Sequence, residues 1–138
     1  FKTKGWINDC IKVLKEHNDM GMAGPINNNN RILTQSFVSR KHMEIFGWFF
    51  PKEIINWCCD DYLNMVYHPK YLYPLHNHLA INQGGQPRYD IDNNKNFTGG
   101  SQMKFGMNVH SLRLKTTKLA NSHKSLIEEY IKKSKADN

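Results

Sequence analysis

The sequence predicts a mixed α/β fold in which short strands have flanking helices. Its 138 residues are enough for one compact domain, and 39% hydrophobic and 12% aromatic residues can supply a core. Segments with helical apolar spacing alternate with short extended ones, and turn residues separate them. This composition excludes a wholly disordered chain. The longest apolar stretch, residues 45–51, is far shorter than the roughly 18 residues of a membrane span.

The chain opens with an expected amphipathic helix. From Trp6 onward, apolar residues recur at helical spacing: Ile7, Cys10, Ile11 and Leu14. Residues 21–25 contain two glycines and a proline, which end the helix and lead into a short extended piece. Residues 26–30, with four consecutive asparagines, predict a loop.

The next segments predict a strand and two helices. Residues 31–37 are apolar and partly β-branched, which is typical of a buried strand. Ser39 suits the N-cap of a helix over 40–46, and Gly47 suits its end. Pro51 fits the first turn of another short helix.

Three further elements follow before residue 93. Residues 60–67 have an apolar face and predict a helix, which a His-Pro pair ends. Residues 71–75 predict an extended segment that its proline confines to a sheet edge. Residues 82–87 predict a turn, and the alternation in 88–92 predicts a strand.

The chain therefore divides into three expected parts. Residues 1–92 form the main folded part, residues 93–106 a mobile polar loop, and residues 107–138 a basic segment that ends in a helix. Ser125 and Glu128 have the spacing of a capping box, so we expect that helix to begin at Ser125.

The charge of the chain is concentrated near its C-terminus. The formal net charge is +7, but residues 1–100 carry 11 basic and 9 acidic side chains, whereas residues 101–138 carry 8 and 3. A basic tail is typical of a solvated helix and loop, so nucleic-acid binding remains an alternative that only the charge favours.

The three cysteines, Cys10, Cys58 and Cys59, predict thiols in the core. Their number is odd, two are adjacent, and no Cys-x-x-Cys pair exists, which argues against a disulfide framework and a structural zinc site. The chain begins with Phe1 rather than Met, so we expect a processed or trimmed piece of a larger protein.

An acidic pair, Asp60 and Asp61, is the sharpest candidate for a chemical role. It lies at the expected start of a helix, where either carboxylate can act as a cap. Alternatively, one of them is a general base that takes a proton from an acceptor hydroxyl. Trp57 lies beside the pair and suits the apolar face of a sugar ring, although most of the surrounding aromatic residues are expected in the core.

Two weaker patterns indicate ligand binding. His76 and His78 are two residues apart in an extended segment, so we expect both on one face, as metal ligands or as ordinary histidines. Gly84, Gly85 and Arg88 lack the strand and helix of a phosphate loop, so a simple turn is the plainer explanation, and an approach to a diphosphate is the alternative.

Several motifs in order resemble a glycosyltransferase-like family found in protists, plants and large DNA viruses. These are Gly24-Pro25, then RILTQSFVSRKHMEIFGWFFPKEIINWCCDDYLNMVY over 31–67, then GGQPRYDID over 84–92. The similarity covers roughly residues 5–92, and the final helix over 124–133 matches more loosely.

The resemblance implies a nucleotide-sugar-dependent A-type fold, with this chain as its acceptor-side C-terminal half. It implies that Asp60 and Asp61 face the acceptor and that Trp57 and Tyr62 line its site. It further implies a divalent metal, usually manganese, on the diphosphate of the sugar donor, with His78 as the nearest candidate for an additional ligand.

The chain departs from the sequence pattern of that family, and the departures limit the activity expected of this chain alone. Tyr62 and Ser39 replace a usual Trp and a usual His, and the only D-x-D, at 90–92, matches a different position. We therefore expect no sugar transfer without a nucleotide-sugar-binding N-terminal half. A non-catalytic structural or glycan-binding module of the same fold is the alternative.

Overall fold

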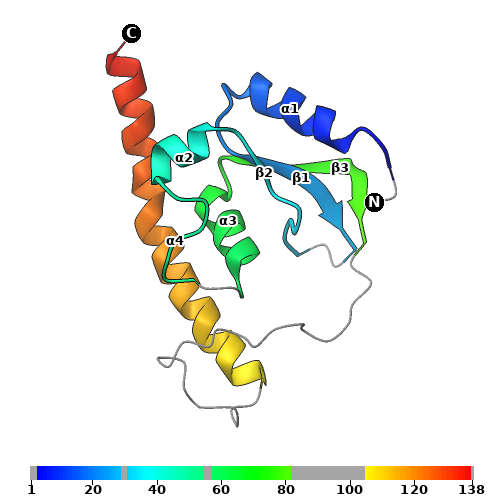
Figure 1. Ribbon diagram of the computed structural model, residues 1–138, viewed down its shortest axis with the longest axis vertical. Coiled ribbons are helices and arrows are strands. Elements are labelled where there is room, and N and C mark those ends of the chain that lie inside the picture. Colours follow the sequence, from blue (N-terminus) through cyan, green and yellow to red (C-terminus); the bar gives the residue numbers. More distant parts are fainter. Residues whose placement is uncertain (1–2, 29–30, 55–56, 82–104, 138) are drawn as a thin grey trace.

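The fold is known from a computed structural model, which describes residues 3–28, 31–54, 57–81 and 105–137. Its helices and strands follow the chain in this order (Figure 1): α1 Trp6–Glu16, β1 Met22–Asn27, β2 Phe37–Val38, α2 Lys41–Phe46, α3 Cys59–Tyr67, β3 Leu72–Ala80 and α4 Phe105–Ala136. This arrangement confirms the mixed α/β class.

The strands form a small sheet in the order β2-β1-β3. The central strand β1 pairs antiparallel with β2 and parallel with β3. A parallel pair needs a crossover connection, and here the chain between β1 and β3 supplies α2 and α3. The expected edge strand over 71–75 is confirmed, and it continues to Ala80.

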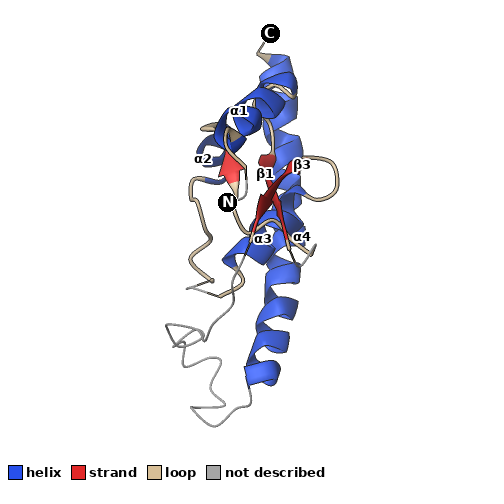
Figure 2. Cartoon of the chain, turned by 90° about the vertical axis from the view of Figure 1, so that its right-hand side faces the viewer, coloured by secondary structure: helices blue, strands red, loops and turns tan. Residues whose placement is uncertain are grey.

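Helices cover both faces of the sheet (Figures 1 and 2): α1 lies on one face, and α3 and α4 lie on the other. Successive side chains of a strand point to opposite faces, and the packing follows this rule. Ala23 of β1 packs with Cys10 and Leu14 of α1. Met22, its neighbour in β1, belongs to the larger core on the α3 side.

The larger core joins α3 to α2 and α4. Tyr62, Leu63, Val66 and Tyr67 of α3 are all at most 2% exposed. The helix α4 spans 32 residues, or about 48 Å at 1.5 Å per residue, and packs along α3. Its Ala120 and Ile127 belong to the same core, so the basic C-terminal segment is part of the main fold.

The helix predictions for the first two thirds of the chain are confirmed for α1, α2 and α3. The helix α2 ends at Gly47, which has a φ of 75°. Ser39 lies one residue earlier than a true N-cap, yet its Oγ accepts a hydrogen bond from the backbone N–H of Lys41 at 3.1 Å.

The strand prediction for 31–37 is wrong except at Phe37. The central strand instead comprises Met22–Asn27, and it includes Ile26 and Asn27 of the expected loop. The physical reason is a side chain: the buried Asn64 of α3 hydrogen-bonds both backbone groups of Leu33, which replaces a strand partner at this point.

Two helix starts are also corrected. Pro51 begins only a turn, in which its carbonyl accepts a hydrogen bond from Ile54 N–H at 3.0 Å. Ser125 does not begin a helix, because it lies in the interior of α4, where Ala120 and Ile127 on either side of it belong to the core. The expected loop over 93–106 therefore loses its last two residues to α4, and residues 82–104 lie outside the described part.

None of the three cysteines forms a disulfide. Cys10 and Cys58 are buried, as expected, and Cys59 is half-buried. Burial raises the pKa of the Cys10 thiol to about 11. Within the described ranges, no helix has the length and apolar character needed to cross a membrane.

Candidate functional site at the start of α3

The acidic pair lies in the first turn of α3. Cys58 precedes the helix in a left-handed conformation, with a φ of 67°, so Asp60 and Asp61 are the second and third helical residues. Neither of them is therefore the N-cap residue. The unpaired backbone N–H groups at a helix N-terminus still favour negative charge nearby.

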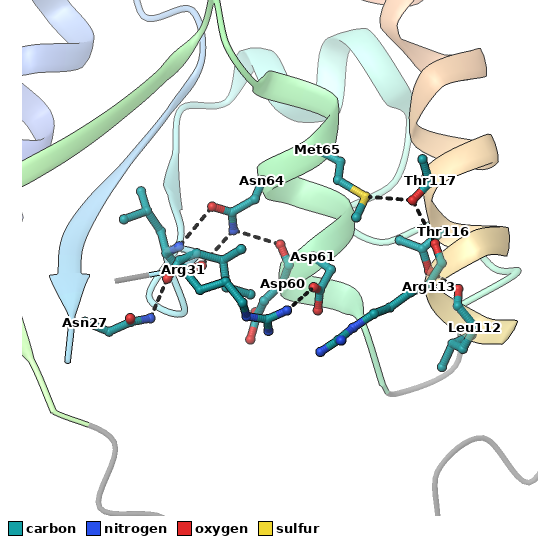
Figure 3. A network of polar contacts seen from close by, with 12 residues as sticks. Asn27, Arg31, Asp60, Asp61, Asn64, Met65, Leu112, Arg113, Thr116 and Thr117 are labelled. Atoms are coloured by element: carbon teal, nitrogen blue, oxygen red, sulfur yellow. Dashed lines mark hydrogen bonds and ion pairs between the residues drawn. The ribbon is translucent and has the colours of Figure 1, made fainter. Parts of the chain in front are cut away.

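Asp61 is held by an arginine from another segment. Arg31 Nη1 lies 3.4 Å from Asp61 Oδ1, and the Asp61 side chain is only 11% exposed. Figure 3 also shows Arg113 of α4 pointing toward the same pair of carboxylates. The ion pair with Arg31 thus ties the start of α3 to the segment that precedes β2.

Asp60 has a different environment. Its carboxylate is half-buried, and burial, followed by the negative charge of Asp61, raises its pKa above the ordinary value. A raised pKa makes an ionised carboxylate a stronger base. Two adjacent carboxylates in unlike environments can take unlike roles, as acid–base sites commonly require.

Asn64 connects the acidic pair to the segment that carries Arg31 (Figure 3). Its Oδ1 accepts a hydrogen bond from Leu33 N–H at 2.9 Å, and its Nδ2 donates to Leu33 O and Asp60 O, each at 2.8 Å. Asn64 is 5% exposed, so these bonds are made away from water. Asn64 therefore keeps Arg31 within reach of Asp61.

The sequence analysis missed Arg31 and Asn64. Asn64 lies between Leu63 and Val66 on a helix that is buried on most sides, and a buried amide needs partners. That position is the signal that could have identified Asn64. Arg31 had no such signal, because its partner is 30 residues away in sequence.

The two aromatic residues expected at the acceptor site lie in different environments. Trp57 is half-buried and immediately precedes the turn into α3. Tyr62 is 0% exposed, and its hydroxyl lies 2.9 Å from Nδ1 of His123. Burial raises the pKa of Tyr62 to about 12. In this arrangement Tyr62 packs in the core, and only Trp57 has surface that an acceptor can contact.

His78 lies away from the acidic pair, on the α1 side of the sheet. Its Nε2 donates to the Asp9 carboxylate at 2.5 Å, and its Nδ1 lies 2.5 Å from the Thr3 hydroxyl. The hydrogen bond from His78 holds the pKa of Asp9 below its ordinary value. Both ring nitrogens of His78 are therefore engaged within the protein.

The expectation that His76 and His78 share one face is wrong. The register of the sheet pairs Pro25 with Leu75 and Ile26 with Leu79, so the intervening residues of β3 have no partner on β1. This irregularity breaks the alternation of side chains. His76 consequently lines a cavity that it shares with Asn64 of α3, while His78 contacts α1.

A metal site is not assembled by the described residues. Within these ranges no three His, Cys, Asp or Glu side chains are placed to hold one ion. Manganese is therefore expected only from the resemblance. The expected diphosphate contacts, Gly84, Gly85 and Arg88, lie outside the described residues.

Comparison with known proteins assigns no relative: no family model matches the chain, and neither a curated protein nor a solved structure matches it. The features that bear on function are therefore the geometry at the start of α3 and the order of the sequence motifs.

Proposed function

We propose that this chain is the acceptor-side part of a metal-dependent glycosyltransferase-like protein. Such a protein moves a sugar from a nucleotide-sugar donor to a hydroxyl group of a glycan or protein acceptor. The order of the motifs over 31–67 supports this proposal, as does the placement of Asp60 and Asp61 in the first turn of α3.

In the proposed reaction Asp60 is the general base. Its carboxylate takes the proton of the acceptor hydroxyl while that oxygen forms a bond to the anomeric carbon of the donor sugar. The bond from the anomeric carbon to the diphosphate breaks, and the diphosphate leaves with the electron pair. Asp61 acts as a positioning residue, since its ion pair with Arg31 ties the start of α3 to the neighbouring segment.

The observation that carries the proposal is the contrast between the two carboxylates. Asp61 is nearly buried and paired with Arg31, whereas Asp60 is half-buried with a raised pKa. Trp57 offers an aromatic surface three residues before Asp60, where the apolar face of an acceptor sugar can pack.

The test is the rate of sugar transfer by the full-length protein with Asp60→Asn or Asp61→Asn. Loss of a general base lowers the rate by about 10² or more, so we expect that loss for Asp60→Asn at unchanged folding. Asp61→Asn should have a smaller effect, and Asp19→Asn, which changes an exposed carboxylate three residues after α1, serves as the matched control.

Two results would contradict the proposal in different ways. Rates within a few-fold of wild type for both variants would remove the acidic pair from catalysis. Binding of a sugar by the full-length protein without any transfer would instead identify the non-catalytic glycan-binding module.

A further inference from the structure

Two adjoining cavities lie on the α3 side of the sheet, with volumes of about 220 and 310 Å³. We call them together the basic groove. Five residues line both cavities: Arg31, Ile32, Asn64, His68 and Leu72. The first cavity reaches Asn27 and His76 on the strands, and the second reaches Lys124 on α4.

The lining of the basic groove is positive. Arg31, whose Nη1 also lies 3.4 Å from Asp61 Oδ1, and Lys124 are its cations, and His68 and His76 add two imidazoles. No carboxylate is among the described residues that line either cavity. Lys124 Nζ donates to the backbone carbonyl of His68 at 2.9 Å, which holds the ammonium group at the cavity. Such a lining favours an anionic group.

One residue that lines the first cavity, Asn27, has a buried acceptor without a donor. Asn27 is 3% exposed, and its Nδ2 donates to the backbone carbonyl of Ile32. Because a carbonyl only accepts, the amide nitrogen of Asn27 must face it, which leaves Oδ1 on the other side. No group of the described residues donates to this Oδ1. Buried polar atoms normally have partners, so this one indicates a ligand that brings a donor.

We propose that the basic groove binds a small anion that carries hydroxyl groups, either a sugar phosphate or a sugar acid. Its anionic group lies near Arg31 and Lys124, and one of its hydroxyls donates to Asn27 Oδ1. Ile32 and Leu72 offer apolar surface to the ring carbons. This inference does not depend on the transfer reaction, because Asp60 takes no part in it.

Isothermal titration calorimetry on this chain at low ionic strength tests the proposal with four probes: glucose 6-phosphate, glucuronate, glucose and inorganic phosphate. A charge-assisted contact combined with a hydroxyl contact should make one charged sugar bind at least about tenfold tighter than glucose and than phosphate. The tighter of the two charged sugars identifies phosphate or carboxylate as the preferred anion. Equal or weaker binding of both, relative to inorganic phosphate, would overturn the proposal.

Variants on α4 decide whether the groove is the binding site. Lys124→Gln should weaken binding of the preferred sugar by about tenfold, as expected for one charged hydrogen bond. Lys132→Gln, an exposed lysine eight residues later on the same helix, should leave the affinity within about twofold. A similar loss in both variants would show attraction by overall charge and would refute the site.

Asn27→Ala provides the second readout. It should weaken binding of the charged sugar while leaving binding of inorganic phosphate unchanged, because the anion lies near Arg31 and Lys124 and only a sugar hydroxyl reaches Oδ1. Loss of both ligands by equal factors in a folded variant would contradict the assigned role of Asn27. If Asn27→Ala does not fold, the two lysine variants decide alone.

Discussion

Asn64 does with one side chain what a neighbouring strand usually does with its backbone. Its carboxamide pairs with both the N–H and the C=O of Leu33, at 2.9 and 2.8 Å, inside the core. The segment around Arg31 can therefore stay irregular and still be fixed against α3. The geometry of the acidic pair thus depends on a residue with no proposed chemical role.

Replacing Asn64 by Ala should lower the free energy of unfolding by about 2–4 kcal/mol, because it leaves two buried backbone groups without partners. Urea denaturation followed by circular dichroism measures the change. Asn121→Ala, an exposed position on α4, should change stability by less than about 0.5 kcal/mol. A loss below about 1 kcal/mol for Asn64→Ala would mean that the Leu33 contacts are not sustained in solution.

The raised pKa of Asp60 predicts a specific pH dependence of stability. A carboxyl whose folded pKa lies above its unfolded value contributes full stability below the unfolded pKa, and this contribution is lost as pH rises through the folded pKa. Asp60→Asn should therefore gain stability relative to wild type at neutral pH, and the gain should vanish at about pH 3.

The unfolding free energies of wild type and Asp60→Asn, measured from acid to neutral pH, would show whether the substitution stabilises the protein at neutral pH. The helix N-terminus acts in the opposite direction, since it favours the ionised form. If Asp60→Asn is instead less stable than wild type at neutral pH and the difference shrinks in acid, the helix N-terminus outweighs burial. The pKa of Asp60 is then lowered rather than raised.

At the scale of elements, apolar spacing predicted α1, α2 and α3 because each has a buried face that the sequence displays locally. The 31–37 segment shows the limit of this reasoning. Its apolar residues fit a strand, but their partner is Asn64, about 30 residues away. The extent of α4 was missed for a related reason: Leu112 and Thr116 are fully buried by packing, whereas the serines and threonines of this segment resemble loop residues.

The packing of α4 predicts unequal effects of one substitution at two nearby positions. Leu112 is 0% exposed and Leu114 is 53% exposed. Leu112→Ala should cost about 2–4 kcal/mol of unfolding free energy, because it removes a buried side chain and leaves a cavity. Leu114→Ala should change stability by less than about 0.5 kcal/mol. Equal effects would contradict the described orientation of α4.

At the scale of the whole molecule, the sheet separates two groups of polar contacts. The acidic pair, Arg31 and the basic groove lie on the α3 side, whereas His78 and Asp9 lie on the α1 side. Local sequence correctly placed Asp60 and Asp61 at a helix start. It could not place His78, because the irregular pairing of β1 with β3 decides which face that residue occupies.

The charge distribution has a similar explanation. Eight basic residues over 101–138 suggested a solvated tail, yet α4 packs one side into the main core and presents lysines elsewhere. One helix can pack into the core and also carry exposed lysines because its apolar and charged residues recur on different faces. The excess charge is thus compatible with a structural role for α4 in the main domain.

The pH dependence of sugar transfer by the full-length protein tests the central claim, that Asp60 is the acceptor base, most directly. If Asp60 is the base, the wild-type rate falls on the acidic side with a pKa above the ordinary aspartate value, and Asp60→Asn has a low rate without this limb. An identical acidic limb in wild type and Asp60→Asn would contradict the claim, because the titrating base would then be another group.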